Sequence, residues 1–456
     1  MVAVDRVVDE GLGNTAWLLD LGDGRALVVD PARDPTPYLD LARRRRLRVA
    51  FSAETHLHAD FVSGSRELAA RGADVLAPRA ARLAFAHRAV DDGEEVGLGG
   101  LSLRALATPG HAPEQVAWLV LDGGRPVAVF TGGALTVGGV ARTDLTGEAG
   151  RTEPLARAAW RSIQQRLLTL PDDLPVYPTH GAGSFCATAG NADRATTVGA
   201  ERRGNPLLAA PDEDGFTERL LGGLGSFPPY FLRLREVNRR GPALLSERDL
   251  TLPRLPAEQV RGELRELGAV LVDVRRAEAF AAGHPAGALS VALRPQFATW
   301  LGWLVEPERP LLFVLDDDQD RAELVRQCRG IGHERLLGEL DGGMAAWRAA
   351  GLPEGRVELV GPERAAEQPL LDVRQASEVA GGRVPGALAV ELGALGRAGA
   401  AAPDLPPGPL TVMCSHGNRA MTGASLLARA GRGDLRVVVG GGAEEWSAAT
   451  GRPLER

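Results

Sequence analysis

The stretch Leu271-Val272-Asp273-Val274-Arg275 returns 99 residues later as Leu370-Leu371-Asp372-Val373-Arg374. The same offset of 99 residues separates two further pairs: Gly287 and Gly386, and Trp347 and Trp446. An offset that stays constant between such distant anchors indicates a duplicated domain. The second half of the chain is therefore predicted to contain two copies of one unit, at residues 259–355 and 360–456.

Each copy alternates short apolar runs with helical stretches. Leu311–Leu315 and Leu410–Met413 predict buried strands, while Arg321–Gln327 and Ala420–Ala430 predict helices. Strands that alternate with helices in this way are typical of a parallel α/β sheet. Proline, glycine and charged residues indicate a linker at residues 246–258, before the first copy.

The loop Cys414-Ser415-His416-Gly417-Asn418-Arg419 carries the strongest chemical signal in the chain. It lies between a predicted strand and a predicted helix, so its backbone N–H groups should converge on the sulfur. The positive end of the helix and the Arg419 cation would further stabilise a thiolate. We predict that Cys414 and Arg419 are the catalytic residues. The rest of the loop is predicted to bind substrate: Ser415, His416, Gly417 and Asn418.

With Asp372 and Gly386 also in place, the second copy resembles the rhodanese family of sulfurtransferases. The resemblance implies that Cys414 takes a sulfane sulfur, holds it as a persulfide and passes it to sulfite or a thiol. The corresponding loop of the first copy reads Asp316-Asp317-Asp318-Gln319-Asp320-Arg321. A carboxylate cannot store sulfur, and a cluster of acids repels anionic donors. The first copy is therefore predicted to be an inactive, structural domain.

Composition narrows the class of protein. The chain has 456 residues and a formal net charge of −7, which argues against nonspecific nucleic-acid binding. We find no run of about 18 apolar residues and expect no membrane span. Three widely spaced cysteines favour a reducing, cytoplasmic location. Of these, Cys328 is predicted to pack in a helix, and Cys186 to be a buried thiol that could also meet persulfide.

Residues 1–245 differ in kind, because predicted strands outnumber helices and histidines follow several strand ends. His56 and His58 follow one apolar run, His111 follows a second and His180 follows a third. Neutral imidazoles suit Fe, Zn or Mn. Four histidines at three strand ends therefore predict a single metal cleft.

These histidines lie in a series of motifs that resembles the metallo-β-lactamase fold. The motifs are His56-Leu57-His58-Ala59-Asp60, Pro109-Gly110-His111, Phe130-Thr131-Gly132-Gly133 and Tyr177-Pro178-Thr179-His180. Two further segments resemble the persulfide dioxygenases of that superfamily, namely Arg142-Thr143-Asp144 and the stretch from Thr179 to Ser184. The resemblance implies an N-terminal αβ/βα metallo-β-lactamase sandwich followed by two α/β rhodanese domains.

Two departures from the usual pattern bear on the metal. Phe61 stands where the motif normally continues with histidine, and Gly133 where it normally has a metal-binding aspartate. We therefore expect at most one metal per chain, held by three imidazoles: His56, His58 and His111. Iron(II) is the favoured ion, zinc is the alternative, and a decayed, empty site is a third outcome. Asp60 and His180 would then lie behind the ligands, or would be left over from a metal site that has been lost.

The resemblance implies persulfide oxidation at the metal coupled to sulfur transfer at Cys414, yielding sulfite or thiosulfate. The expected small molecules are persulfides, thiosulfate or sulfite, and glutathione or a similar thiol. The sequence is compatible with a homo-oligomer but does not determine the oligomeric state. Two alternatives remain. In the first, the protein is a sulfurtransferase only, with residues 1–245 a degenerate binding or dimerisation module. In the second, which ranks last, it is a thioester hydrolase resembling glyoxalase II, a chemistry that usually needs two metals and the missing carboxylate.

Overall fold

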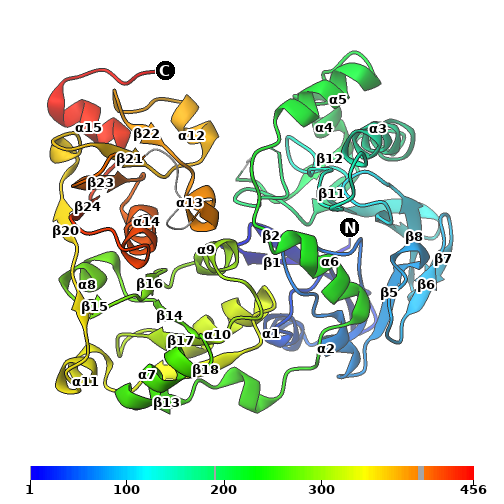
Figure 1. The fold of residues 1–456 in the computed structure, drawn as a ribbon. Coiled ribbons are helices and arrows are strands. Elements are labelled where there is room, and N and C mark those ends of the chain that lie inside the picture. The colour runs from blue at the N-terminus through cyan, green and yellow to red at the C-terminus, as the bar shows by residue number, and fades with distance from the viewer. Residues whose placement is uncertain (1, 189–191, 399–404) are drawn as a thin grey trace. The chain divides into compact units, whose positions relative to one another are not determined.

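The computed structural model describes residues 2–188, 192–398 and 405–456 (Figure 1). The chain divides into two compact units. The first contains residues 1–246 together with Arg329–Gly332, and the second contains Glu247–Cys328 and His333–Arg456. Among the described residues, no helix is both long enough and apolar enough to cross a membrane.

The first sheet of the first unit has six strands in sequential order, antiparallel at its start and parallel from β3 onward. Its strands are β1 (Val4–Asp9), β2 (Asn14–Asp20), β3 (Arg25–Val29), β4 (Arg48–Ala53), β5 (Asp74–Pro78) and β6 (Arg88–Val90). Helices α1 (Thr36–Arg44) and α2 (Ser65–Ala69) and the 3₁₀ turn Arg79–Ala81 connect its later strands.

The second sheet also has six strands, in the order β12-β11-β10-β9-β8-β7. Its strands are β7 (Glu95–Gly97), β8 (Leu101–Ala107), β9 (Val116–Asp122), β10 (Arg125–Gly132), β11 (Pro175–Pro178) and β12 (Thr196–Thr197). The helices of this half are α3 (Thr152–Ser162), which continues as a π-helical turn to Leu167, α4 (Val198–Gly204), α5 (Glu213–Gly222) and α6 (Phe231–Arg240).

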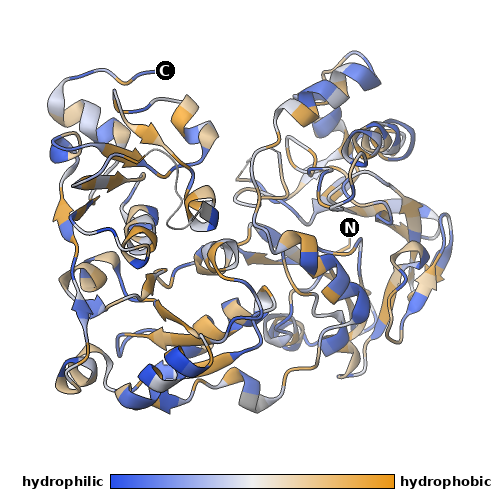
Figure 2. Cartoon of the chain, in the orientation of Figure 1, coloured by the Kyte–Doolittle hydropathy of each residue, from blue (hydrophilic) through white to orange (hydrophobic). Residues whose placement is uncertain are grey.

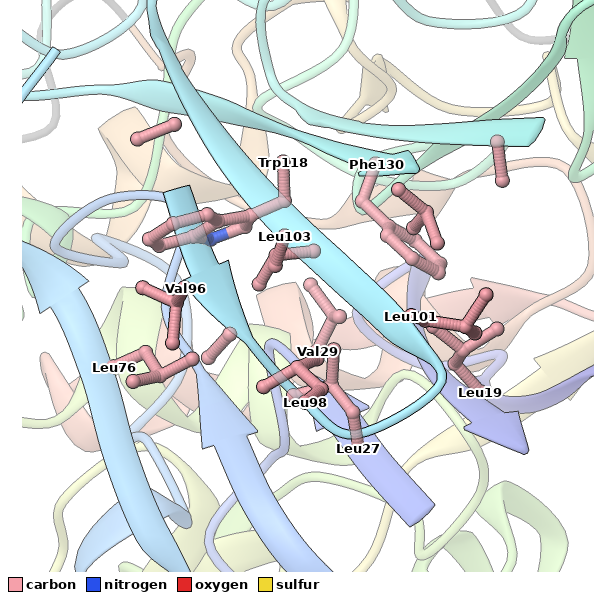
Figure 3. Packing of buried hydrophobic residues seen from close by; sticks show 14 of the residues in the cluster. Leu19, Leu27, Val29, Leu76, Val96, Leu98, Leu101, Leu103, Trp118 and Phe130 are labelled. Carbon is pink, nitrogen blue, oxygen red and sulfur yellow. The ribbon is translucent and has the colours of Figure 1, made fainter. Parts of the chain in front are cut away.

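Apolar side chains from the inner faces of both sheets form one core (Figure 3). Leu27 and Val29 of the first sheet pack with Leu103, Trp118 and Phe130 of the second. Strand β8 alternates buried and half-buried residues, the period-two pattern of a strand with one face in a core. The outer faces pack against helices, including α1 on the first sheet and α3 on the second. The expected αβ/βα sandwich is confirmed.

The second unit contains two five-stranded parallel sheets with the same strand order (Figure 1). The first is β13 (Arg254–Leu255), β18 (Leu336–Leu340), β17 (Leu311–Val314), β14 (Val270–Asp273) and β16 (Leu289–Ser290). The second is β20 (Glu358–Val360), β24 (Leu435–Val438), β23 (Leu410–Met413), β21 (Leu370–Asp372) and β22 (Leu388–Ala389). The predicted duplication is therefore present in the topology.

Helices accompany the strands of each copy. The first copy has α7 (Ala257–Glu266), α8 (Ala277–Ala282), α9 (Phe297–Leu304), α10 (Arg321–Gly330) and α11 (Gly343–Ala349), with the short pair β15 (His284–Pro285) and β19 (Glu354–Gly355). The second has α12 (Ala376–Ala380), α13 (Leu392–Ala398), α14 (Asn418–Arg429) and α15 (Ala443–Thr450). Two 3₁₀ turns span Glu247–Leu250 and Pro362–Arg364. In Figure 2 the strands of both copies are largely hydrophobic, whereas α7 is hydrophilic over much of its length.

The repeated sequence motif builds the same buried ion pair in both copies. Arg275 pairs with Asp273 at 2.6 Å, and Arg374 pairs with Asp372 at 2.7 Å. Each guanidinium also donates to the carbonyl eight residues further on. In the segment 246–258, expected as a linker, β13 pairs with β18 and α7 begins at Ala257. The end of that segment therefore packs with the first copy.

Candidate functional site

The histidines of the first unit lie at one edge of the sandwich because their strands end there. In the second sheet, β8, β10 and β11 run in the same direction, since β9 is antiparallel to both β8 and β10 and β11 is parallel to β10. His111 follows β8 and His180 follows β11, while His56 and His58 follow β4 of the first sheet. All four side chains are buried.

The four imidazoles form one cluster. The ring centre of His56 lies 4.2 Å from that of His58, 4.8 Å from His111 and 5.4 Å from His180. The Nε2 atoms of His56 and His180 are 3.3 Å apart. Among the described residues, three sets of side chains have donor atoms within 4.8 Å of one another: His56 with His58 and His180, His111 with His180 and Cys186, and Asp30 with Glu54 and His58. His180 is common to the first two sets.

Acceptor groups fix which nitrogen of His56 and His111 carries a proton. His111 Nδ1 lies 2.6 Å from the carbonyl oxygen of Arg142, which can only accept, so Nδ1 is the donor and Nε2 keeps a free lone pair. His56 Nδ1 lies 2.8 Å from Thr55 Oγ1, whose own hydrogen goes to Asp30. Burial lowers the pKa of His111 to about 3 and that of His56 well below its usual value. Both rings are therefore neutral, as metal ligands must be.

His58 is oriented the opposite way. Its Nε2 lies 3.1 Å from the Glu54 carboxylate and 3.3 Å from that of Asp30, so this nitrogen donates. Burial lowers the pKa of His58, but Asp30 and Glu54 outweigh it and raise the pKa to about 10. Its Nδ1 has no hydrogen-bond partner among the described residues although it is buried. A metal at this nitrogen would have to displace the proton that this pKa implies; a donor atom of His58 lies within 4.8 Å of donor atoms on His56 and His180.

Asp60 and Asn14 fix the fourth ring. Asn14 donates from Nδ2 to Asp60 at 2.7 Å, which leaves its Oδ1 to accept from His180 Nδ1 at 2.9 Å. The Nε2 of His180 points towards the Nε2 of His56, 3.3 Å away. Asp60 thus lies behind the His180 ring, and His180 presents its other nitrogen to the cluster.

Gly133 leaves no room for the usual aspartate. A Cβ atom at this position would lie 2.5 Å from His111 Cδ2 and 2.9 Å from the Cβ of Ala141. The His111 ring therefore takes up the space that a side chain would need. Phe61, the other departure from the motif, stacks on His58 with ring centres 4.2 Å apart. The residues present fit one metal ion held by nitrogen donors.

Three residues that hold the histidines were missed by sequence reasoning: Asp30, Glu54 and Asn14. Asp30 follows β3, as the histidines follow their strands, and its φ of +52° is uncommon for a residue with a side chain. It accepts from the backbone N–H and hydroxyl of Thr55, each at 2.7 Å, and from the Thr179 hydroxyl. The signal available in the sequence was an acid directly after an apolar run.

In the second unit, the Cys414 loop lies between β23 and α14. Cys414 directly follows β23, and its sulfur accepts from the backbone N–H of Gly417 at 3.1 Å and of Ala420 at 3.4 Å. Gly417 takes a φ of +91°, and a Cβ there would lie 3.0 Å from Val439. Helix α14 begins at Asn418, two residues before the predicted start, so its first amides point at the sulfur. Ser415 and Asn418 are half-buried, and His416 is exposed.

Arg419 has a role different from that of a free cation. Its guanidinium forms a double hydrogen bond with Glu378 at 2.6 and 2.7 Å and donates to the Ser415 hydroxyl at 3.1 Å. Burial raises the pKa of Glu378, but the Arg419 guanidinium outweighs it and holds the pKa at about 2. This ion pair fixes the position of the loop. The Glu378 carboxylate neutralises much of the Arg419 charge, so less of that charge acts on Cys414.

The first copy contributes to the surroundings of Cys414. Arg294, in the turn between β16 and α9, has a pKa lowered by burial, an effect that the nearby Cys414 opposes and Arg419 strengthens. Its side chain donates no hydrogen bond to any described residue. The Trp300 ring of the same copy lies 5.9 Å from the Arg419 guanidinium, and Ser290 donates its backbone N–H to Ser425 of α14. Sequence reasoning missed Arg294 because it lies on the other copy.

The loop of the first copy is filled by its own side chains. Gln319 Oε1 accepts from the Asp316 backbone N–H at 3.0 Å, and its amide donates to the Val274 carbonyl at 2.8 Å. Arg321 donates to three loop carbonyls, including that of Asp316, and pairs with Glu339 at 3.0 Å. This copy lacks both the sulfur and an open cradle for an anion.

The other two cysteines, Cys186 and Cys328, are both buried thiols. Cys328 lies in α10 as predicted. Cys186 lies beside His111 and His180, and burial, strengthened by the Asp60 carboxylate, raises the pKa of its thiol well above the usual value.

Comparison with known proteins gives the same division of the chain. Residues 9–180 match the model of the metallo-β-lactamase superfamily, and residues 256–350 and 358–449 each match the rhodanese-like domain. The human mitochondrial persulfide dioxygenase ETHE1 is 29% identical over 204 residues, which is 44% of this chain and 73% of the relative. A probable metallo-hydrolase of Burkholderia pseudomallei is 32% identical over 202 residues, covering 36% of this chain and 66% of the relative.

A solved structure extends the likeness across the domains. A metallo-β-lactamase from Staphylococcus aureus superposes with a TM-score of 0.66 at 25% identity, covering 74% of this chain and 98% of that one. The chain thus combines an N-terminal metallo-β-lactamase-fold domain, homologous to the persulfide dioxygenases, with two rhodanese-like domains.

Proposed function

We propose that the protein oxidises a low-molecular-weight persulfide at a single metal ion in the first unit and transfers sulfane sulfur through Cys414 in the second. The observation that carries the first half is the set of four buried imidazoles whose other nitrogens are all engaged by acceptors. Such partners fix the tautomer and the aim of metal-binding histidines. The homology of this domain to persulfide dioxygenases supports the substrate class.

The ligands we assign are His56, His58 and His111, joined by His180. Iron(II) is favoured because imidazole donors with open positions suit dioxygen chemistry, and zinc is the alternative. A bound iron would supply the redox chemistry by which a persulfide, dioxygen and water become a thiol, sulfite and two protons. The chain's own groups orient the rings, and Phe61 shields one face of His58 from water.

Sulfur transfer at Cys414 is a double displacement. The thiolate attacks the outer sulfur of a persulfide, the sulfur–sulfur bond breaks, and the thiol leaves with the bonding electrons. The Cys414 persulfide anion is then stabilised by the N–H groups of Gly417 and Ala420. Attack by sulfite on the outer sulfur releases thiosulfate and restores the thiolate. Sulfite from the first reaction would thus feed the second.

One observation favours the second candidate, a sulfurtransferase with a non-catalytic first domain. Gly133 removes the carboxylate that the family normally uses, and His111 occupies its space. Oxygen uptake by iron-loaded protein on glutathione persulfide distinguishes the two. Our proposal expects uptake that disappears in a His111→Ala variant and persists in Cys414→Ser. If fully iron-loaded protein takes up no oxygen, only the second candidate, a sulfurtransferase with a non-catalytic first domain, stands.

A further inference from the structure

Cys186 is held against the histidine cluster by the same backbone segment, at Arg142, that holds His111. The Arg142 carbonyl accepts from His111 Nδ1 at 2.6 Å, and the Arg142 backbone N–H donates to the Cys186 carbonyl at 2.8 Å. The backbone N–H of Cys186 donates to the Ser184 hydroxyl at 3.1 Å. Its side chain is 0% exposed. The sulfur therefore has a fixed position beside the ring of His111.

The sulfur lies within 4.8 Å of donor nitrogens on two of the imidazoles, those of His111 and His180. Each of these rings points a bare Nε2 away from a partner that engages its Nδ1. The donor atoms of the three side chains, two ring nitrogens and one sulfur, thus all lie within 4.8 Å of one another.

The same region contains a buried polar atom that lacks a partner. Asp60 is 1% exposed, and one of its carboxylate oxygens, Oδ1, has no hydrogen-bond partner among the described residues. The Asp60 carboxylate is close enough to Cys186 to raise the pKa of the thiol. A buried carboxylate oxygen without a donor is costly, and a nearby cation removes that cost.

The cluster also lacks an anionic ligand where the family has one. Gly133 has no side chain, and a Cβ atom there would collide with His111. Asp30 and Glu54 are engaged by His58 and by hydroxyl groups. Among the buried groups beside His111 and His180, Cys186 can become a charged ligand by losing one proton.

We propose that Cys186 binds the metal together with His111 and His180, and that its thiolate supplies the negative charge that Gly133 cannot. This inference rests on the proposed metal centre. On binding, the thiol releases its proton to solvent and a sulfur–metal bond forms, with no change in oxidation state. A thiolate shifts the preference of the site towards zinc and cobalt over harder ions.

Cobalt(II) substitution tests this inference, because a thiolate bound to cobalt gives a near-ultraviolet charge-transfer band that imidazole ligands do not give. The variant to load is Cys328→Ser/Cys414→Ser, in which Cys186 is the sole thiol. We expect one cobalt per chain and the charge-transfer band. Changing Cys186→Ser in that background should remove the band and weaken binding by at least about 10- to 100-fold, the loss that even an outer partner of a ligand produces.

The outcomes separate this inference from the proposed function. Bound cobalt with visible ligand-field bands but no charge-transfer band in the Cys186-only protein would overturn the thiolate ligand and leave the metal centre standing. Failure to bind cobalt or iron at all would overturn the metal centre itself. Because the decisive spectrum is that of a protein with Cys186 intact, the result does not depend on how well the Cys186→Ser variant folds.

Discussion

The Nε2 atoms of His56 and His180 lie 3.3 Å apart although 124 residues separate the two histidines in sequence. Each Nδ1 is engaged elsewhere, by Thr55 and by Asn14. The two nitrogens converge because His56 follows β4 and His180 follows β11, strands of different sheets. This relationship places His180 within the histidine cluster.

Gly133→Asp is predicted to lose metal, although it restores the family's residue. The new Cβ would lie 2.5 Å from His111 Cδ2 and push the ring from its place. Metal content after loading, measured by elemental analysis, should fall below that of the native protein. Gly133→Ala adds only the methyl group and should lose metal to a similar degree. A higher metal content or faster oxygen uptake in Gly133→Asp would refute this explanation.

Asn14→Ala is predicted to weaken metal binding by about 10- to 100-fold without touching a ligand. The amide fixes the tautomer of His180 and donates to Asp60, and alanine does neither. Titration with zinc against a competing chelator measures the change. Asn205→Ala is the matched control, because Asn205 is a buried amide bonded to Gly139 and Glu201, away from the cluster. Equal zinc affinity in both variants would contradict the role of Asn14 in fixing the His180 ring.

Arg294→Met is predicted to raise the KM for thiosulfate by about tenfold while changing kcat little. A half-buried cation near Cys414 with no partner in the described chain is suited to hold an anionic donor, and a charge-assisted bond to an anion contributes about 1.5–3 kcal/mol. Arg294→Lys keeps the charge and should recover part of the loss. An unchanged KM in the methionine variant would show that the inactive copy does not contribute to anion binding.

Asp316→Cys is predicted to leave the first copy inactive, assayed in a Cys414→Ser background. Asp317, Asp318 and Asp320 would still repel anionic donors, and Gln319 would still fill the loop. Replacing the three acids with asparagine and Gln319 with glycine in addition should help far more than the single change. Activity of the single variant equal to that of the native Cys414 copy would mean that only the missing sulfur silences this loop.

The fold and the loop around Cys414 could be predicted from the sequence because their signals are local. The 99-residue offset and the strand–loop–helix order around Cys414 need no knowledge of distant contacts. The partners that tune each site could not be found in this way. Asn14 lies 166 residues from His180, and Glu378 lies 41 residues from Arg419. Nothing in either local sequence indicates these contacts, which arise when separate elements pack together.

The central claim is that Cys414 carries the transferred sulfur. Mass spectrometry after incubation with thiosulfate tests it most directly, followed by cyanide, which removes a sulfane sulfur. We predict that the peptide containing Cys414 gains one sulfur atom and loses it to cyanide, that Cys414→Ser abolishes thiosulfate:cyanide transfer, and that Cys328→Ser leaves transfer intact. Retention of most of the transfer activity by Cys414→Ser, or a sulfur gained only on another cysteine, would contradict the claim.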